Sequence, residues 1–255
     1  MANRLKDLDP TGRFSNRVAH YAKYRPSYPP ELIAFLEQWR PGAGRAGQVA
    51  DIGSGTGILT ELLLLKGLYV IGVEPNAEMR GEAERRLAGY ERFFSQAGRA
   101  EATGLEDQSV DLITVAQAFH WMDPTASRAE FLRILRPGGH IALIWNLRLP
   151  DSPFLQGYEK LVLEFGKNYE AANRIDEPAI AAFFSGLRQK VTAFPNEQLL
   201  DFETLKGRVL SASYMPLEKD AGYDDMIRRL EDLFARFNEN GLVKMDYETK
   251  VYYNE

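Results

Sequence analysis

The sequence predicts an α/β fold with a doubly wound, mostly parallel sheet. Short apolar segments alternate with helical patterns from residue 48 to residue 146, as expected for parallel strands covered on both faces. A glycine-rich turn at residues 53–57 lies where the first strand passes into a helix, the position at which open α/β sheets bind ligands. We therefore expect one sheet with a ligand site at the carboxyl ends of its strands.

Composition and charge narrow the class of protein. The 255 residues are 45% hydrophobic and 26% charged, which is typical of a globular protein. There is no cysteine, so disulfides, thiolate metal sites and cysteine nucleophiles are excluded. The chain has a net charge of -5 and so lacks the excess of positive charge expected of a nucleic-acid-binding protein. A local basic patch is still compatible with this net charge. No apolar run has the length of a membrane span or resembles a signal peptide, so we expect a cytoplasmic enzyme.

The elements follow in order along the chain. Three prolines between Tyr21 and Pro30 favour extended backbone before an amphipathic helix over residues 31–39 and a loop over residues 41–47. Pro137-Gly138-Gly139 predicts a turn that separates a helix from a following strand. The predicted strands are residues 48–52, 68–73, 93–96, 110–115, 141–145, 190–194 and 250–253. The predicted helices are residues 58–66, 77–88, 127–135, 154–169, 202–210 and 224–238.

The spacing of the glycines and one carboxylate indicate the kind of ligand. Position 58, where a dinucleotide fingerprint requires its third glycine, is Ile58, and the Gly-Lys-Ser/Thr of a P-loop is absent. Glu74 ends the second predicted strand, where a carboxylate would accept hydrogen bonds from both hydroxyls of a ribose. Together these features predict a nucleoside ligand without a pyrophosphate. An ordinary glycine-rich turn is the alternative interpretation.

Four motifs follow one another along the chain: Asp51 to Gly57, Val73 to Asn76 with Met79, Ala100 to Leu105 with Ser109 to Ile113, and Leu135 to Gly139. In this order they resemble the motifs of the class I S-adenosylmethionine-dependent methyltransferases. Residues 12–30 and 117–123 are similar to a small-molecule branch that includes trans-aconitate methyltransferase-like enzymes, whereas the C-terminal third matches only loosely. The resemblance implies a Rossmann-like methyltransferase fold, S-adenosylmethionine as cofactor, S-adenosylhomocysteine as product and no metal.

The resemblance also implies a role for individual residues. Asp51 would contact the amino group of the cofactor, Glu74 its ribose, and Arg25 its carboxylate. Arg99 stands where many relatives have an acidic residue; because a guanidinium accepts no hydrogen bond, we expect it to point away into solvent. The full set of implied cofactor-binding residues is Tyr21, Arg25, Asp51, Gly53, Ser54, Gly55, Gly57, Glu74, Pro75, Met79, Ala100, Glu101 and Gln117.

His120 is the candidate catalytic residue, because it follows the fourth predicted strand directly. Its imidazole would take a proton from an acceptor or orient a carboxylate, and a packed structural histidine is the alternative. We expect Trp121 to be a pocket wall, Asp123 a helix cap and His140 structural, whereas His20 would line the site only if the N-terminal segment folds over it. A structural arm is the alternative for that segment. No His/Asp/Glu grouping has the spacing of a metal site.

These expectations combine into one interpretation of the chain. Residues 1–255 would form a single methyltransferase domain: an N-terminal helical cover (1–47), the cofactor-binding core (48–146), a helical insertion (147–188) that roofs a compact pocket, and the rest of the sheet with the acceptor region (189–255). The expected reaction is methyl transfer to a small molecule, at a carboxylate or hydroxyl oxygen, by a monomer or homodimer. The alternatives are a catalytically silent cofactor-binding module, a methyltransferase acting on nucleic acid or an amine, and a nicotinamide oxidoreductase.

Overall fold

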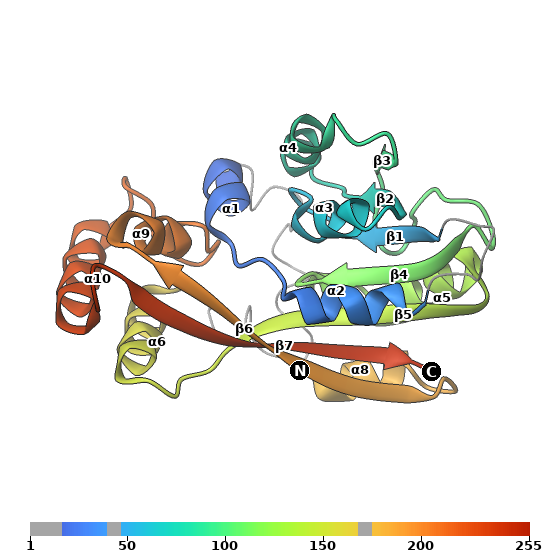
Figure 1. The fold of residues 1–255 in the computed structure, drawn as a ribbon. Coiled ribbons are helices and arrows are strands. Elements are labelled where there is room, and N and C mark those ends of the chain that lie inside the picture. Colours follow the sequence, from blue (N-terminus) through green and yellow to red (C-terminus); the bar gives the residue numbers. More distant parts are fainter. Residues whose placement is uncertain (1–16, 40–46, 168–174) are drawn as a thin grey trace.

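A seven-stranded sheet forms the centre of the computed structural model, which describes residues 17–39, 47–167 and 175–255 (Figure 1). The strand order is β3-β2-β1-β4-β5-β7-β6, and β7 is the one strand of this sheet that runs antiparallel to its neighbours. The predicted doubly wound, mostly parallel fold is therefore confirmed. The strands are β1 (Gln48–Ile52), β2 (Tyr69–Val73), β3 (Phe93–Gln96), β4 (Val110–Ala116), β5 (Leu135–Arg148), β6 (Gln189–Leu200) and β7 (Val243–Asn254).

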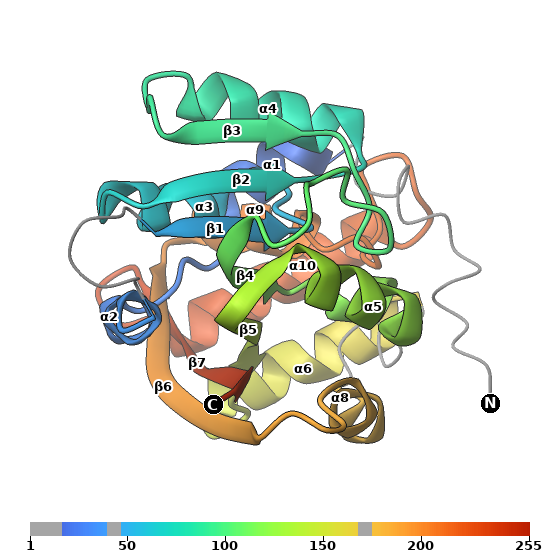
Figure 2. The same ribbon diagram turned by 90° about the vertical axis from the view of Figure 1, so that its right-hand side faces the viewer.

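Helices cover both faces of the sheet. Figure 2 shows α2 and α5 on opposite sides of the sheet. Both faces need covering because the central strands β1 and β4 are apolar on both faces. One face packs against α2, α3 and α4, and the other packs against α5 and α8. The helices are α1 (Val18–Tyr24), α2 (Pro30–Glu37), α3 (Ile58–Leu65), α4 (Ala77–Leu87), α5 (Pro124–Ile134), α6 (Pro153–Phe165), α8 (Glu177–Phe183), α9 (Phe202–Leu210) and α10 (Tyr223–Phe237).

Strand β5 begins six residues earlier than the sequence predicts, at Leu135 instead of Ile141. Leu135 pairs with Val110 of β4, and His140 pairs with Leu112, so five steps along β5 correspond to two along β4. The predicted turn at Pro137-Gly138-Gly139 is therefore a bulge inside a strand. Gly138 makes this possible, because its φ of +77° lies in the left-handed region that other residues avoid.

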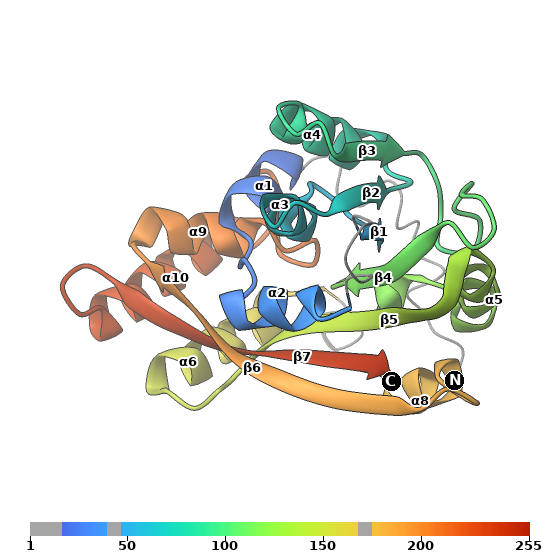
Figure 3. The same ribbon diagram turned by 45° about the vertical axis from the view of Figure 1, so that its right-hand side comes forward.

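The last two strands are much longer than predicted. β6 and β7 pair antiparallel along their full length, from Gln189 opposite Asn254 to Leu200 opposite Val243. Their distal parts extend beyond the parallel strands, and α6, α9 and α10 gather around them (Figure 3). A separate apolar core forms there, with Leu205, Met226 and Leu230 fully buried.

The helical insertion is described only in part, and its role as a roof stays a prediction. The predicted helix 154–169 ends at Phe165, and residues 168–174 lie outside the described part, as do residues 1–16 and most of the predicted loop 41–47. Of the described helices in this region, α6 packs against α10 whereas α8 packs against α5, so these two belong to different parts of the fold.

Helix α1 belongs to the N-terminal segment that we expected to act as a cover. It contacts α9 and α4 beyond the carboxyl ends of the parallel strands (Figure 1). Arg17, just before α1, is buried and donates hydrogen bonds to the carbonyl oxygens of Leu210 (2.9 Å), Ala212 (2.7 Å) and Met215 (2.5 Å). The N-terminal segment is thereby fastened to the loop that follows α9.

Candidate active site

The three glycines of the turn after β1 have different surroundings. All three have positive φ, so each allows a backbone that other residues rarely adopt. A Cβ atom on Gly53 would lie 2.7 Å from the Cβ of Ala118, and one on Gly55 would lie 3.3 Å from Met79, on the open side of the turn. A Cβ atom on Gly57 would instead lie 2.8 Å from Leu87 of α4. Gly57 therefore permits close helix packing, and Gly53 permits the close approach of Ala118.

Glu74 is held beside this turn by two backbone hydrogen bonds. Its Oε2 accepts from the N–H of Gly55 and its Oε1 from the N–H of Asn76, each at 2.9 Å. Burial raises the pKa of the Glu74 carboxyl, and the two backbone N–H groups and Arg80 oppose that rise. A carboxylate has about four acceptor sites, so these two bonds leave capacity for two hydroxyl donors.

Asp51 is buried behind the turn and has other partners. Its two oxygens accept hydrogen bonds from the hydroxyls of Thr60 (2.7 Å) and Thr114 (2.9 Å). Burial raises the pKa of Asp51 to about 6, although both threonine hydroxyls act in the opposite direction. Asp51 thus joins β1 to α3 and β4, and its cofactor contact stays a prediction.

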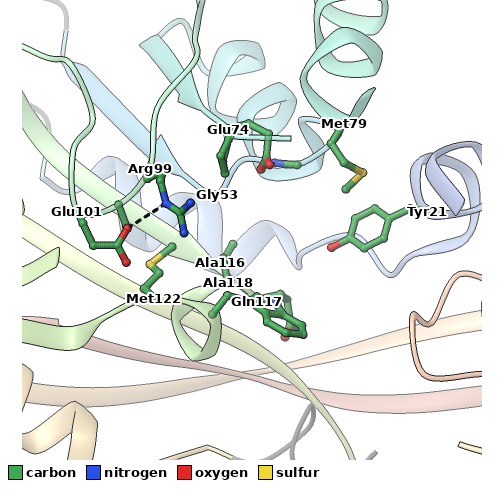
Figure 4. A pocket seen from close by; sticks show the side chains of 14 residues that line it. Tyr21, Gly53, Glu74, Met79, Arg99, Glu101, Ala116, Gln117, Ala118 and Met122 are labelled. Atoms are coloured by element: carbon green, nitrogen blue, oxygen red, sulfur yellow. Dashed lines mark hydrogen bonds and ion pairs between the residues drawn. The ribbon is translucent and has the colours of Figure 1, made fainter. Parts of the chain in front are cut away.

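A cavity opens in front of Gly53 and Gly55, and we call it the first cavity (Figure 4). Tyr21 and the Arg99–Glu101 pair lie at opposite ends of it in Figure 4, with Glu74 and Met79 along one side. Nine of the predicted cofactor-binding residues line it, whereas Arg25, Asp51, Ser54 and Gly57 do not. Its lining is Tyr21, Gly53, Gly55, Glu74, Pro75, Met79, Arg99, Ala100, Glu101, Ala116, Gln117, Ala118, Trp121 and Met122.

Arg99 lines the first cavity, which differs from our expectation that it would point away. Its side chain is 59% exposed, and its Nε lies 3.8 Å from Oε2 of Glu101. The other oxygen of Glu101 accepts a hydrogen bond from the N–H of Asp123 at 2.8 Å. Arg99 can remain largely solvated and still line the rim, because the carboxylate of Glu101 draws it there.

A second cavity adjoins the first and shares Tyr21, Gln117 and Trp121 with it. Arg25 lines this second cavity, and so does the candidate catalytic residue His120. Sequence reasoning did not single out Tyr28, Asn146 and Arg148, because their side chains meet the others only through the fold. The lining is Tyr21, Arg25, Pro26, Tyr28, Ile58, Gln117, His120, Trp121, Asn146, Arg148, Arg208, Ser213 and Tyr214.

Comparison with known proteins identifies this arrangement. Residues 50–143, which contain the glycine turn, Glu74 and the strand ends, match the family described as "Methyltransferase domain". The chain is 44% identical over 135 residues to a protein of Mycobacterium tuberculosis named as an uncharacterized methyltransferase, a match that covers 53% of this chain and 52% of that protein. The chain therefore resembles methyltransferases over residues 50–143. It spans about half the length of the curated relatives that it matches first.

Solved structures share the fold of this chain. A candidate type II methyltransferase from Anaeromyxobacter dehalogenans superposes with a TM-score of 0.64 at 20% identity, over 91% of this chain and 96% of that one. The geranyl diphosphate C-methyltransferase of Streptomyces coelicolor, solved with S-adenosylhomocysteine, gives a TM-score of 0.51 at 14% identity, over 88% of this chain and 77% of that one. At these identities the likeness shows the fold.

The three histidines of the chain have distinct positions. His120 lies in a short 3₁₀ helix (Phe119–Trp121) between β4 and α5, with its ring centroid 4.9 Å from that of Trp121. His20 stacks on Tyr24 and lines neither cavity, whereas His140 stacks on Trp39 at 4.7 Å and is structural. The predicted cap is confirmed, since the side chain of Asp123 accepts from the N–H groups of Thr125 and Ala126.

Two further features of the described residues concern metals and membranes. They contain no group of three His, Asp or Glu side chains that could hold a metal ion. No helix in the described ranges combines the length and apolar character needed to cross a membrane.

Proposed function

We propose that the protein transfers the methyl group of S-adenosylmethionine to an oxygen of a small-molecule acceptor. The observation that carries the proposal is the pair of adjacent cavities. The first contains the residues suited to a nucleoside cofactor, and the second contains His120 and a polar lining. The two cavities meet at Tyr21, Gln117 and Trp121, so a methyl group at that wall would face both.

The first cavity fits the cofactor by its chemistry. Glu74 keeps free acceptor capacity for the ribose hydroxyls, and its orientation is already fixed by Gly55 and Asn76. Gly53 and Gly55 line the cavity where the methionine part would lie, and the buried side chain of Met79 offers an apolar surface to the adenine. When bound, the cofactor supplies an electrophilic methyl carbon and a good leaving group. The protein then contributes position and exclusion of water.

His120 is proposed to act on the acceptor. A carboxylate acceptor attacks without losing a proton, and His120 would then orient it. A hydroxyl acceptor must lose its proton, and an imidazole at this position would accept it. The similarity of residues 117–123 to trans-aconitate methyltransferase-like enzymes supports an oxygen acceptor.

The test is transfer of labelled methyl groups to a panel of small acids, phenols, amines and transfer RNA. We expect the label to appear in acids or phenols. The His120→Ala variant should have a raised KM if the acceptor is an acid, or a lowered kcat if it is a phenol. Label in transfer RNA alone, or in amines alone, would contradict the proposed acceptor. Cofactor binding without transfer to any member would favour a catalytically silent module.

A further inference from the structure

The second cavity carries more positive than negative charge. Three arginines line it, Arg25, Arg148 and Arg208, and no lining residue in the described part of the chain has a carboxylate. Arg148 is paired with Glu159, at 3.1 Å. Neither of the other two has a carboxylate within 4 Å among the residues that the structure describes. The cavity therefore contains two guanidinium groups whose charge is not balanced by a protein carboxylate.

Arg208 is the more deeply buried of these two, at 3% exposure. Its Nε lies 3.4 Å from the Tyr247 hydroxyl and its Nη1 lies 3.5 Å from the Ser211 hydroxyl, both long for hydrogen bonds. Tyr247 donates its own proton to Gln198, so it meets Arg208 as an acceptor. A guanidinium has five N–H donors, and two long contacts with neutral oxygens satisfy few of them. A buried charge in this condition is costly unless an ion of opposite sign is bound.

Arg25 lies in the same cavity and also lacks a counter-ion. It is placed over the Tyr21 ring, 4.8 Å from its centroid, and its Nη2 donates to the carbonyl oxygen of Ser211 at 3.1 Å. Its Nε is buried without a hydrogen-bond partner in the structure. Burial lowers the pKa of Arg25, and the nearby charge of Arg208 lowers it further. Binding an anion in this cavity would relieve the repulsion between the two groups.

We propose that the methyl acceptor carries an anionic anchor group, bound by Arg208 together with Arg25, that is separate from the atom receiving the methyl group. This inference rests on the proposed function. Arg208 and Arg25 line the second cavity and not the first, whereas the shared wall consists of Tyr21, Gln117 and Trp121. The reacting atom must be at that wall. An oxygen bound directly by guanidinium groups would also be a weaker nucleophile, because those hydrogen bonds withdraw its charge.

The chemical step leaves the anchor unchanged. A lone pair of the reacting oxygen forms a bond to the methyl carbon, and the carbon–sulfur bond breaks with its electron pair moving to sulfur. The sulfonium becomes the neutral thioether, S-adenosylhomocysteine. A carboxylate nucleophile becomes a neutral ester, and a hydroxyl nucleophile releases a proton to His120 or solvent. The product then keeps one anionic group, so it is a methylated acid.

Binding of matched acids and amides tests this proposal. The probes are 4-hydroxybenzoate against 4-hydroxybenzamide and succinate against succinamide, titrated into the wild-type protein with and without saturating S-adenosylhomocysteine. We expect at least one acid to bind about 10-fold or more tightly than its amide, as charge-assisted hydrogen bonds to guanidinium allow. Equal affinity of acids and amides would overturn the proposal without any variant being made.

Variants of Arg208 locate the anion. Arg208→Met should reduce the affinity for the acid about 10-fold or more and leave the affinities for the amide and for S-adenosylhomocysteine unchanged. Arg208→Lys keeps the charge without the planar fork, so its affinity for the acid should lie between those of the wild-type protein and Arg208→Met. It also replaces Arg208→Met in the test if that variant does not fold. Arg229→Met removes an exposed arginine of α10 that pairs with Glu164, and should behave as wild type.

The outcomes separate this proposal from the proposed function. If Arg208→Met weakens binding of S-adenosylhomocysteine, the guanidinium binds the carboxylate of the cofactor, and the proposed anchor is wrong. If the wild-type protein does not bind S-adenosylhomocysteine, the proposed function fails. Discrimination between acid and amide by the protein without cofactor would still support an anion site in the second cavity.

Discussion

Two buried carboxylates lie behind the glycine turn, and their partners differ. Glu74 accepts two backbone N–H groups and lines the first cavity, whereas Asp51 accepts two threonine hydroxyls and does not line it. The sequence could not show that only Glu74 lines the cavity, because Asp51 near the end of β1 and Glu74 directly after β2 both come close to the same turn. The separation depends on Thr60 and Thr114, which the fold brings to Asp51 from α3 and β4.

Removal of the Glu74 carboxylate should weaken cofactor binding. We expect Glu74→Ala to reduce the free energy of S-adenosylhomocysteine binding by about 1.5–3 kcal/mol, the range for hydrogen bonds to a charged group. The measurement is calorimetric titration, with circular dichroism to show that the variant is folded. Glu91→Ala, which removes an exposed carboxylate outside the cavity lining, should bind normally. Wild-type affinity in folded Glu74→Ala would mean that the ribose is held elsewhere.

The raised pKa of Asp51 should make stability depend on pH. Its pKa is about 6 in the folded protein against 3.8 for the unperturbed group, so between these values the folded state binds more protons than the unfolded state. Its contribution to stability is therefore complete below pH 4 and is lost as the pH rises through 6. The shift corresponds to about 3 kcal/mol at most.

Asp51→Asn removes this ionisation and keeps the shape of the side chain. We expect its free energy of unfolding in urea, relative to wild type, to increase between pH 4 and pH 7, whereas the exposed control Asp151→Asn should show no such change. A difference between Asp51→Asn and wild type that stays constant with pH would show that Asp51 does not titrate in this range.

At the scale of elements, local patterns predict some segments fully and others only in part. β1, β3 and α9 have the predicted bounds. An apolar run marks β1 and helical periodicity marks α9, whereas the pattern of β3 is weak. β6 alternates between exposed and half-buried residues, so burial does not mark its ends. Its length comes from pairing with β7, and short-range pattern does not reveal such a partner.

The covering role of α1 is likewise invisible to local pattern. The helix is seven residues long and contains no buried residue, so its own sequence does not show what it covers. Its position depends on Arg17, whose partners are about 195 residues away in the sequence. The resemblance to a known branch supplied the expectation of a cover, and the contact with α9 supplies its physical basis.

Arg17→Met should loosen this cover. It leaves three carbonyl oxygens without their donor, and we expect a loss of about 1–3 kcal/mol in unfolding free energy. Because Tyr21 and Arg25 line the cavities from this segment, amides of α1 should exchange faster and S-adenosylhomocysteine should bind more weakly. Arg85→Met, at an exposed pair with Glu82, is the control. Unchanged exchange in α1 would show that Arg17 does not fasten it.

At the scale of the whole molecule, the candidate site lies where three separate parts of the chain meet. The carboxyl ends of β1, β2 and β4 supply the first cavity, and α1 and the region of α9 close the second. The motifs of residues 51–105 could be predicted because they are contiguous and depend on glycine and carboxylate chemistry. Arg148 and Arg208 could not be assigned to one cavity, since they are 60 positions apart and become neighbours through β5 and α9.

The central claim is that the first cavity binds S-adenosylmethionine, and calorimetric titration of the whole protein tests it most directly. S-adenosylmethionine, S-adenosylhomocysteine and NAD would each be titrated into the wild-type protein under identical conditions. We expect saturable binding of both sulfur compounds at one site per chain and no comparable binding of NAD, because Ile58 replaces the third glycine of a dinucleotide site. Tighter binding of NAD than of either sulfur compound would contradict it.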